Sequence, residues 1–388
     1  MAKFIALFCL FVFVAGCSCP ATKVKHTATE EKEELLELAS DRHTVESRFF
    51  KLTLFPGVSG GIENIVLKGQ NTPLLWGGKL VQVSNGPLVV RPQAFGVLFS
   101  EKFWRADEVI SNMKVQKTAA DSVTLYCPEY GTSSAELVRH ITLGKDELSV
   151  NFKVDVKFLK EPRKGYSSPW LNLMPARDMD WVTALPGRGN EAVNGLGTKT
   201  YFPATAIYRG GVKGGGQNTY FAPARAWAAV SSAKKGVAVA IIHDYPLEKC
   251  TLYSWKGHYE GTVGRTIEFI LPELKLDKEL RGSWNYRLLI FPRITDLREI
   301  CNDTAIEYRQ NGKMLTMRFC PVRKVPAQKV ELFLNEKGKT TALGAKTLAA
   351  LDAGKVGELT FELPQDKLSG TISGTLNGKP FSILPVIK

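Results

Sequence analysis

The segment from Glu161 to Arg225 holds a group of aromatic, acidic and arginine side chains. It has little strand pattern and is rich in glycine, proline, arginine and aromatic residues. A loop segment of this length inside a compact domain is usually either functional or disordered. Aromatic rings can pack on the C–H groups of a sugar, while carboxylate and guanidinium groups hydrogen-bond its hydroxyls. The candidate binding residues are Trp170, Arg177, Asp178, Asp180, Trp181 and, further along the chain, Trp255.

The run Arg-Asp-Met-Asp-Trp at residues 177–181 is the most concentrated part of this group. Asp178 is also a candidate catalytic acid or base. The alternative is that Asp178 and Asp180 are ordinary loop acids paired with Arg177. Both interpretations stay open from the residues alone.

Other candidates for acid–base catalysis are two histidines and a glutamate. His243 directly follows the apolar run 237–242, and His258 and Glu260 lie close to Trp255. Histidine and carboxylate side chains commonly act as general acids and bases. The alternative is an isolated histidine with no chemical role. The five histidines are too dispersed to indicate a metal site, so we expect neither a metal nor a cofactor.

The body of the chain predicts an all-β fold. In residues 148–158 apolar and polar side chains alternate throughout, which is typical of an antiparallel strand with one buried face. No segment after residue 47 shows a convincing helical period. Many strands separated by turn residues favour a sandwich or a barrel. The clearest expected strands are Phe49–Leu54, Ile62–Leu67, Ser122–Cys127, Glu136–Leu143, Leu148–Phe158, Ala226–Ser231, Gly236–His243, Thr266–Leu271 and Trp284–Phe291.

The order of these strands resembles the galactose mutarotase-like family. Residues 50–76 look like its opening hairpin, and 122–158 like its paired strands with Arg-x-Ile-Thr-Leu in the second. Residues 226–240 resemble a later strand pair, and 271–292 a closing segment that ends Trp-Asn-Tyr-Arg-Leu-Leu-Ile-Phe-Pro. The resemblance covers about 48–293. It implies a large antiparallel supersandwich whose concave face binds carbohydrate, in a family that includes both enzymes and binding modules.

The chain departs from this family at its catalytic histidines. The stretch Ser-Ser-Pro-Trp-Leu-Asn-Leu at 167–173 places Ser168 where the resemblance implies a histidine. No histidine lies between His43 and His140 to match the earlier one. Serine cannot exchange protons near neutral pH in the way that histidine does. We therefore do not expect mutarotase activity.

Residues 298–388 carry a strand pattern of their own. Asn377-Gly378 between two apolar runs is a strong hairpin signal. The pattern predicts a small immunoglobulin-like β-sandwich. The expected domains are a signal peptide at 1–16, a polar linker with a short helix at 17–47, the supersandwich at 48–297 and the immunoglobulin-like sandwich at 298–388. A disulfide between Cys301 and Cys320 is one candidate pairing near this junction.

The N-terminus resembles a bacterial lipoprotein signal. Lys3 is the only charged residue among the first 22, and residues 4–14 are uninterruptedly apolar but too few to span a bilayer. Val-Ala-Gly-Cys at 14–17 resembles a lipobox, which implies that Cys17 is lipidated and anchors the protein to a membrane. The alternative is a buried first helix. We expect a lipid-anchored protein of the bacterial cell envelope, at the outer membrane if the organism is diderm.

The formal net charge of +13 indicates attraction to an anionic partner. Export makes nucleic acid the least expected partner, whereas carbohydrate, including anionic polysaccharide, fits the other features. The alternative is that dispersed lysines only keep the protein soluble. The leading hypothesis is non-catalytic glycan binding. The alternatives are a carbohydrate-active enzyme (a polysaccharide lyase, a glycoside hydrolase or an aldose epimerase-like enzyme) and a structural envelope protein.

Overall fold

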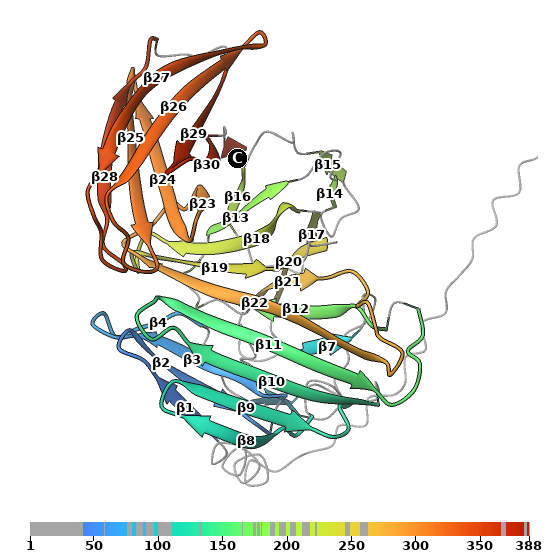
Figure 1. The fold of residues 1–388 in the computed structure, drawn as a ribbon. Coiled ribbons are helices and arrows are strands. Elements are labelled where there is room, and N and C mark those ends of the chain that lie inside the picture. Colours follow the sequence, from blue (N-terminus) through green and yellow to red (C-terminus); the bar gives the residue numbers. More distant parts are fainter. Residues whose placement is uncertain are drawn as a thin grey trace, which may run out of the picture. The chain divides into compact units, whose positions relative to one another are not determined.

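In the computed structural model, the described part of the chain is built from β-strands (Figure 1). The described residues are 42–57, 59–75, 80–82, 88–90, 97–99, 111–131, 134–164, 166–173, 176, 179, 181–186, 191–193, 199–201, 207–211, 218–221, 223–244, 249–256, 263–365, 370–383 and 386–387. For several strands, among them β14, β17 and β20, only the backbone is described. No helix in these residues could cross a lipid bilayer. The expected signal peptide, Cys17 and linker helix lie outside the described residues.

A ten-stranded sheet forms one layer of the large sandwich. Its strand order is β31-β16-β13-β18-β19-β22-β11-β10-β9-β8, and only the β16–β31 pair is parallel among its described pairs. Its strands are β8 (Lys114–Ala119), β9 (Ser122–Cys127), β10 (Ala135–Leu143), β11 (Ser149–Phe158), β13 (Trp181–Pro186), β16 (Ile207–Gly211), β18 (Pro223–Ser232), β19 (Val237–His243), β22 (Arg281–Pro292) and β31 (Val386–Ile387).

Two further sheets face the inner side of this layer. The four-stranded sheet contains β1 (His43–Glu46), β2 (Phe50–Phe55), β3 (Gly61–Leu67) and β4 (Thr72–Pro73). The seven-stranded sheet contains β7 (Val97–Phe99), β12 (Pro169–Leu173), β14 (Glu191–Val193), β15 (Lys199–Tyr201), β17 (Asn218–Phe221), β20 (Lys249–Lys256) and β21 (Val263–Ile270). Strands β5 (Leu80–Gln82) and β6 (Leu88–Val90) form a separate pair. Buried apolar residues from all three large layers form one hydrophobic core.

Side chains that alternate along a strand give it one face in the core and one face at the surface. Along β10, every second residue from Ala135 to Leu143 is buried, and the residues between them are partly or fully exposed. Strand β11 alternates in the same way over most of its length. Because neighbouring side chains of a strand point to opposite faces, this sheet has an apolar inner face and a polar outer face.

The C-terminal strands form a smaller sandwich of two four-stranded antiparallel sheets. One contains β23 (Glu299–Cys301), β24 (Thr304–Asn311), β25 (Met314–Pro321) and β28 (Gly357–Glu362). The other contains β26 (Gln328–Glu336), β27 (Lys339–Leu348), β29 (Thr371–Leu376) and β30 (Lys379–Ile383). These sheets enclose a second hydrophobic core. The all-β fold class, with a large antiparallel sandwich followed by a small one, is confirmed. The domain boundaries stay predictions.

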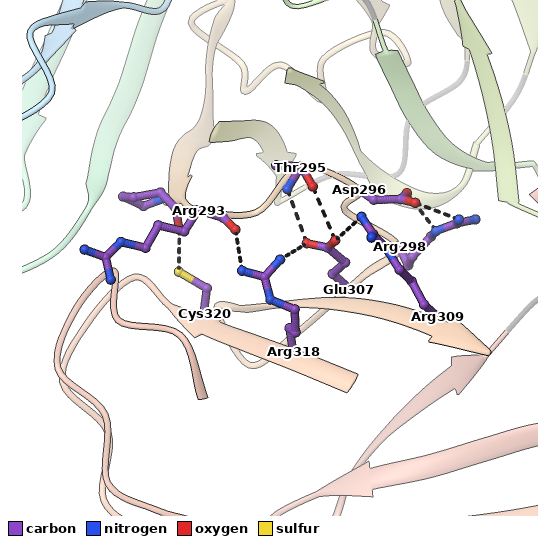
Figure 2. A network of polar contacts seen from close by, with 9 residues as sticks. Arg293, Thr295, Asp296, Arg298, Glu307, Arg309, Arg318 and Cys320 are labelled. Atoms are coloured by element: carbon purple, nitrogen blue, oxygen red, sulfur yellow. Dashed lines mark hydrogen bonds and ion pairs between the residues drawn. The ribbon is translucent and has the colours of Figure 1, made fainter. Parts of the chain in front are cut away.

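A buried carboxylate connects the small sandwich to the segment that follows β22 (Figure 2). Glu307 on β24 accepts a hydrogen bond from Arg318 Nη1 at 2.9 Å and from the backbone N–H and hydroxyl of Thr295, each at 3.3 Å. Arg318 also donates to the carbonyl oxygen of Arg293 at 2.9 Å. The chain leaving the large sandwich is therefore held against two strands of the small one.

The candidate disulfide between Cys301 and Cys320 is wrong. Both residues are reduced thiols in the structure. Cys301 belongs to the core of the small sandwich, whereas Cys320 packs in the core cluster of the large one. Burial raises the pKa of the Cys320 thiol to about 12, and the thiol donates to the carbonyl oxygen of Pro292. Sequence proximity suggested a pairing, but the two side chains point into different cores.

Candidate functional site

An open groove of about 740 Å³ lies on the outer face of the ten-stranded sheet. Strands β10, β11 and β22 line it, together with the extended segment 271–280 that joins β21 to β22. The polar residues that line it are Glu136, Lys153, Asp155, Lys157, Lys275, Asp277, Arg281 and Ser283. The groove therefore offers both hydrogen-bond donors and acceptors to a ligand.

Strand register brings the sheet residues of this groove together. Glu136 on β10 is paired with Lys157 on β11, which is in turn paired with Arg281 on β22. In the next outward-facing row, Asp155 is paired with Ser283. Directly opposed side chains on one face of a sheet have Cβ atoms about 5 Å apart. Three strands that are distant in sequence thus form one polar surface.

The segment 271–280 forms one wall of the groove because it passes close over a glycine. A Cβ atom on Gly282 would lie 3.0 Å from Leu276 Cδ2 and 3.3 Å from Leu274 Cδ1. Asp277 then closes the turn into β22 by accepting the backbone N–H groups of Glu279 and Arg281 at 2.8 and 2.9 Å. These hydrogen bonds, that of Arg281 above all, lower the pKa of Asp277. The wall is therefore fixed by local contacts.

Some charges of the groove are already paired and others are not. Lys153 Nζ lies 3.0 Å from Asp155, and Arg281 lies 2.6 Å from Glu279. Among the described residues, neither Lys157 nor Lys275 forms an ion pair. These two ammonium groups remain available to a ligand oxygen. The arrangement is suited to binding a polar ligand, and the groove contains no described histidine.

None of these groove residues was among the candidates from sequence. One signal was visible: Lys153, Asp155 and Lys157 alternate with apolar residues and must share a face. Lys275 and Arg281 carried no such signal, because their place beside β11 depends on the path of the chain. Apart from His243, which ends an expected strand, the sequence candidates came from the segments 161–225 and 255–260.

Most sequence-predicted site residues cannot be compared with this geometry. Arg177, Asp178, Asp180, His258 and Glu260 lie outside the described residues. For Trp181 on β13 and Trp255 on β20 only the backbone is described. Their proposed roles stay predictions.

Trp170 lies on β12, between β7 and β21 of the seven-stranded sheet. Its side chain is 9% exposed, and its indole N–H has no hydrogen-bond partner among the described residues. A flat aromatic platform for a sugar needs an open ring face, so this degree of burial does not favour that role. The unpaired N–H would still suit an acceptor.

His243 ends β19 and points into the sandwich core. It is 3% exposed, and its ring lies 5.2 Å from that of Phe269 and 5.9 Å from that of Tyr286. Burial lowers the pKa of His243 to about 3. The ring is therefore neutral at physiological pH and enclosed by aromatic groups. This setting does not favour the catalytic role predicted for His243, which stays a prediction.

The described side chains offer no cluster that suits a metal ion. Within that part of the chain, no group of three or more histidine, cysteine, aspartate or glutamate side chains is placed to hold one. The groove acids illustrate this: Asp155 is paired with Lys153, and Asp277 is occupied by backbone N–H groups.

Among known proteins, only solved structures resemble this chain. No protein-family model matches the sequence, and no curated protein matches it. A galactose mutarotase-like protein from Lactobacillus casei is 13% identical, with 64% of this chain and 99% of that chain covered and a TM-score of 0.44. A galactose mutarotase related enzyme from Lactobacillus acidophilus is 10% identical, with coverages of 67% and 100% and a TM-score of 0.45.

A TPR-domain containing protein from Parabacteroides distasonis is also similar. It is 10% identical, with 64% of this chain and 46% of that chain covered and a TM-score of 0.48. TM-scores below 0.5 at such identities assign neither a family nor an activity to this chain.

Proposed function

We propose that this protein is a lipid-anchored component of the bacterial envelope that binds a carbohydrate without transforming it. The lipobox-like end of the apolar N-terminal run supports the anchor. The resemblance of the strand order to galactose mutarotase-like domains supports the carbohydrate ligand. The all-β sandwich is consistent with both enzymes and binding modules of that kind.

The observation that carries the carbohydrate proposal is the polar groove on the outer face of β10, β11 and β22. Its volume of about 740 Å³ is large enough for a ligand of several rings. Carboxylates, ammonium groups and the hydroxyl of Ser283 alternate around it, and the side chains of Val138 and Leu276 add apolar surface for C–H groups. This mixture suits a molecule that carries many hydroxyls on an apolar ring.

The absence of catalysis is proposed from the chemistry of this groove. Its acids, Glu136, Asp155 and Asp277, lie among four cationic side chains, those of Lys153, Lys157, Lys275 and Arg281. A general acid at neutral pH needs a raised pKa. At Asp277 the effect is the opposite, because the backbone N–H groups of Arg281 and Glu279 donate to its carboxylate and lower its pKa. Binding therefore describes the groove better than proton transfer.

The test uses the chain from Ala21 onward, which keeps every described residue, on an array of neutral, uronic and sulfated glycans. We expect binding of at least one glycan and no shortened or epimerised product after incubation with it. The double variant Asp155→Ala/Lys157→Ala should weaken binding. The matched control is Glu358→Ala/Lys355→Ala, which removes one acid and one base from the small sandwich.

The outcomes separate the three functions named from the sequence. Binding to no glycan would refute the proposal and leave a structural envelope role. Formation of a product would identify an enzyme. If the groove variant binds glycan as tightly as the wild type, the carbohydrate site lies in another part of the chain.

A further inference from the structure

The outer face of five neighbouring strands, β8 to β11 and β22, is markedly basic. Figure 1 shows these strands side by side, in the order that the hydrogen-bonded ladders require. Its acidic members are Glu136 and Asp155. Its lysine and arginine members are Lys114, Lys117, Lys153, Lys157, Arg281 and Arg287. We call this surface the basic face.

A β-bulge places two of these lysines on the same side. The register between β8 and β9 shifts between Val115 and Lys117, so that Lys114 is paired with Tyr126 and Lys117 with Thr124. In a regular strand, residues three apart point to opposite faces. The extra residue of the bulge removes this opposition. Both lysines therefore lie in rows with outward-facing partners on β9.

These rows continue across the sheet to the groove. Thr124 is paired with His140, which is paired with Lys153 and then with Asn285. Neighbouring strands are about 4.8 Å apart, so the four steps from β8 to β22 span roughly 19 Å. The hydroxyl of Thr124 and the imidazole of His140 lie between Lys117 and Lys153 along this row, and the amide of Asn285 follows Lys153. The Lys117 row is thus polar from β8 to β22, whereas the Lys114 row crosses Tyr126 and the apolar Val138 before it reaches Asp155 in the groove.

Only part of this positive charge is neutralised within the chain. Arg287 forms a bidentate pair with Asp303 at 2.8 and 2.9 Å, and Lys153 is paired with Asp155. Lys114, Lys117 and Lys157 have no ion pair with another described residue. Lysines on an edge strand such as β8 can also serve to prevent sheet-to-sheet aggregation. Protection of an edge strand does not require Lys114 and Lys117 to lie on the same face of the sheet as the groove.

We propose that the basic face binds an anionic polysaccharide, which lies across the strands from Lys114 and Lys117 to the groove at Lys157. This inference rests on the carbohydrate-binding function proposed above and names the class of its ligand. Charge complementarity supplies the attraction. The side chains of Thr124, His140 and Asn285 along the same row supply hydrogen-bond partners for sugar hydroxyls.

The test compares dextran sulfate with dextran, because the two share a backbone and differ in their sulfate esters. The variant is Lys114→Ala/Lys117→Ala, and the control is Lys313→Ala/Lys339→Ala, which removes equal charge from exposed positions of the small sandwich. We expect the wild-type chain to bind dextran sulfate and not dextran. Lys114→Ala/Lys117→Ala, which we call the edge variant, should lose two exposed ion pairs with the polysaccharide and bind it about five- to tenfold more weakly. The control should weaken binding less than about twofold.

Each other result has a defined meaning. Equal weakening by the edge variant and the control would show non-specific attraction and overturn the proposal. If Lys157→Ala weakens dextran sulfate binding and the edge variant does not, the ligand is restricted to the groove. That result would overturn the extended site but leave the carbohydrate-binding function standing. If the wild-type chain binds no glycan of any charge, the function itself fails.

A membrane is the other anionic surface to examine. Vesicles of phosphatidylglycerol provide this arm of the experiment, with phosphatidylcholine vesicles as the uncharged comparison. Lysine-dependent binding to phosphatidylglycerol without binding to dextran sulfate would assign the basic face to lipid headgroups and overturn the proposal. Dextran sulfate binding without vesicle binding supports it.

Discussion

Arg139 is completely buried in the large sandwich, where hydrogen bonds to neutral groups hold its guanidinium. Nη1 donates to the carbonyl oxygen of Gly60 at 2.7 Å, and Nη2 donates to the phenol oxygen of Tyr286 at 3.0 Å. The ring of Tyr286 stacks on that of Phe152, with centroids 4.5 Å apart. Buried charges are normally paired or well hydrogen-bonded, and Arg139 is of the second kind. It connects the ten-stranded sheet to the turn between β2 and β3.

His243 should make the stability of the protein depend on pH. Its pKa falls from an ordinary 6.5 to about 3 on folding, because burial disfavours the charged ring. Between these values the unfolded chain binds a proton that the folded chain does not. The free energy of unfolding should therefore fall as the pH falls from about 6.5 towards 3, by at most about 1.4 kcal/mol per pH unit from this residue.

The measurement is urea unfolding between pH 7 and pH 4.5 for the wild type and for His243→Leu. We expect a shallower pH dependence in His243→Leu. Phe269→Leu, which changes the buried ring beside His243 without removing a titratable group, serves as the control and should keep the wild-type dependence. An unchanged slope in His243→Leu would show that the ring does not stay neutral in the fold.

At the scale of elements, the turn between β2 and β3 depends on a glycine. Gly60 has a φ of +60°, and a Cβ atom there would overlap Leu125 Cδ1 and lie 3.2 Å from Met113 Sδ. Its carbonyl oxygen is also the acceptor for Arg139. The turn combines a left-handed backbone with a close approach to the core, and only glycine satisfies both conditions.

Gly60→Ala should lower the free energy of unfolding by roughly 3 kcal/mol, from backbone strain and overpacking together. Gly69→Ala is the matched control. Gly69 has a φ of +82°, but a Cβ atom there would meet nothing within 4 Å, so only the strain of about 1 kcal/mol applies. Denaturant midpoints of the two variants measure the difference. Equal losses would contradict the close packing at Gly60.

The whole molecule depends on how its two sandwiches are joined after β22. The carboxylate of Glu307 is 1% exposed, and its partners come from β24, β25 and the connecting segment (Figure 2). The pair between Asp296 and Arg298 lies in the same segment, with Arg298 Nη2 2.8 Å from Asp296 Oδ2. Polar contacts of this kind constrain direction as well as distance. The junction is therefore held by a buried network, in addition to the apolar contacts of Cys320 and Val322 with the large core.

Glu307→Gln should destabilise the protein, because the amide carries no charge to offset the guanidinium of Arg318. Its NH₂ group would also replace one of the two oxygens that accept hydrogen bonds, so that Thr295 and Arg318 or Thr295 and Arg309 would lose their acceptor. We expect a loss of about 1–3 kcal/mol in the free energy of unfolding. Unfolding followed by tryptophan fluorescence in urea measures it. Glu362→Gln, at an exposed position of β28, should leave the midpoint unchanged. A Glu307→Gln midpoint equal to that of the control would show that the network contributes nothing to stability.

Sequence patterns identified strands well where one face is buried. All nine of the clearest expected strands correspond to observed ones, for example 148–158 to β11 and 284–291 to the larger part of β22. Strands β8 and β27 were missed, because nearly all of their residues are exposed and no apolar alternation marks them. An edge strand of this kind forms because it hydrogen-bonds to the neighbouring strand, and its own apolar residues contribute little. Strand β1 likewise begins at His43, inside the segment expected to be linker.

The two faces of each strand follow from local sequence alone, since side chains of a strand alternate between faces whatever the strand pairs with. This alternation places Lys153, Asp155 and Lys157 on one face and Arg139 among apolar residues. Which strands are neighbours, and in which register, depends on the folded chain as a whole. The groove needs β10, β11, β22 and the 271–280 segment together, and the basic face needs a bulge in β8. The packing of the whole core determines which strands become neighbours, and no local sequence pattern encodes that packing.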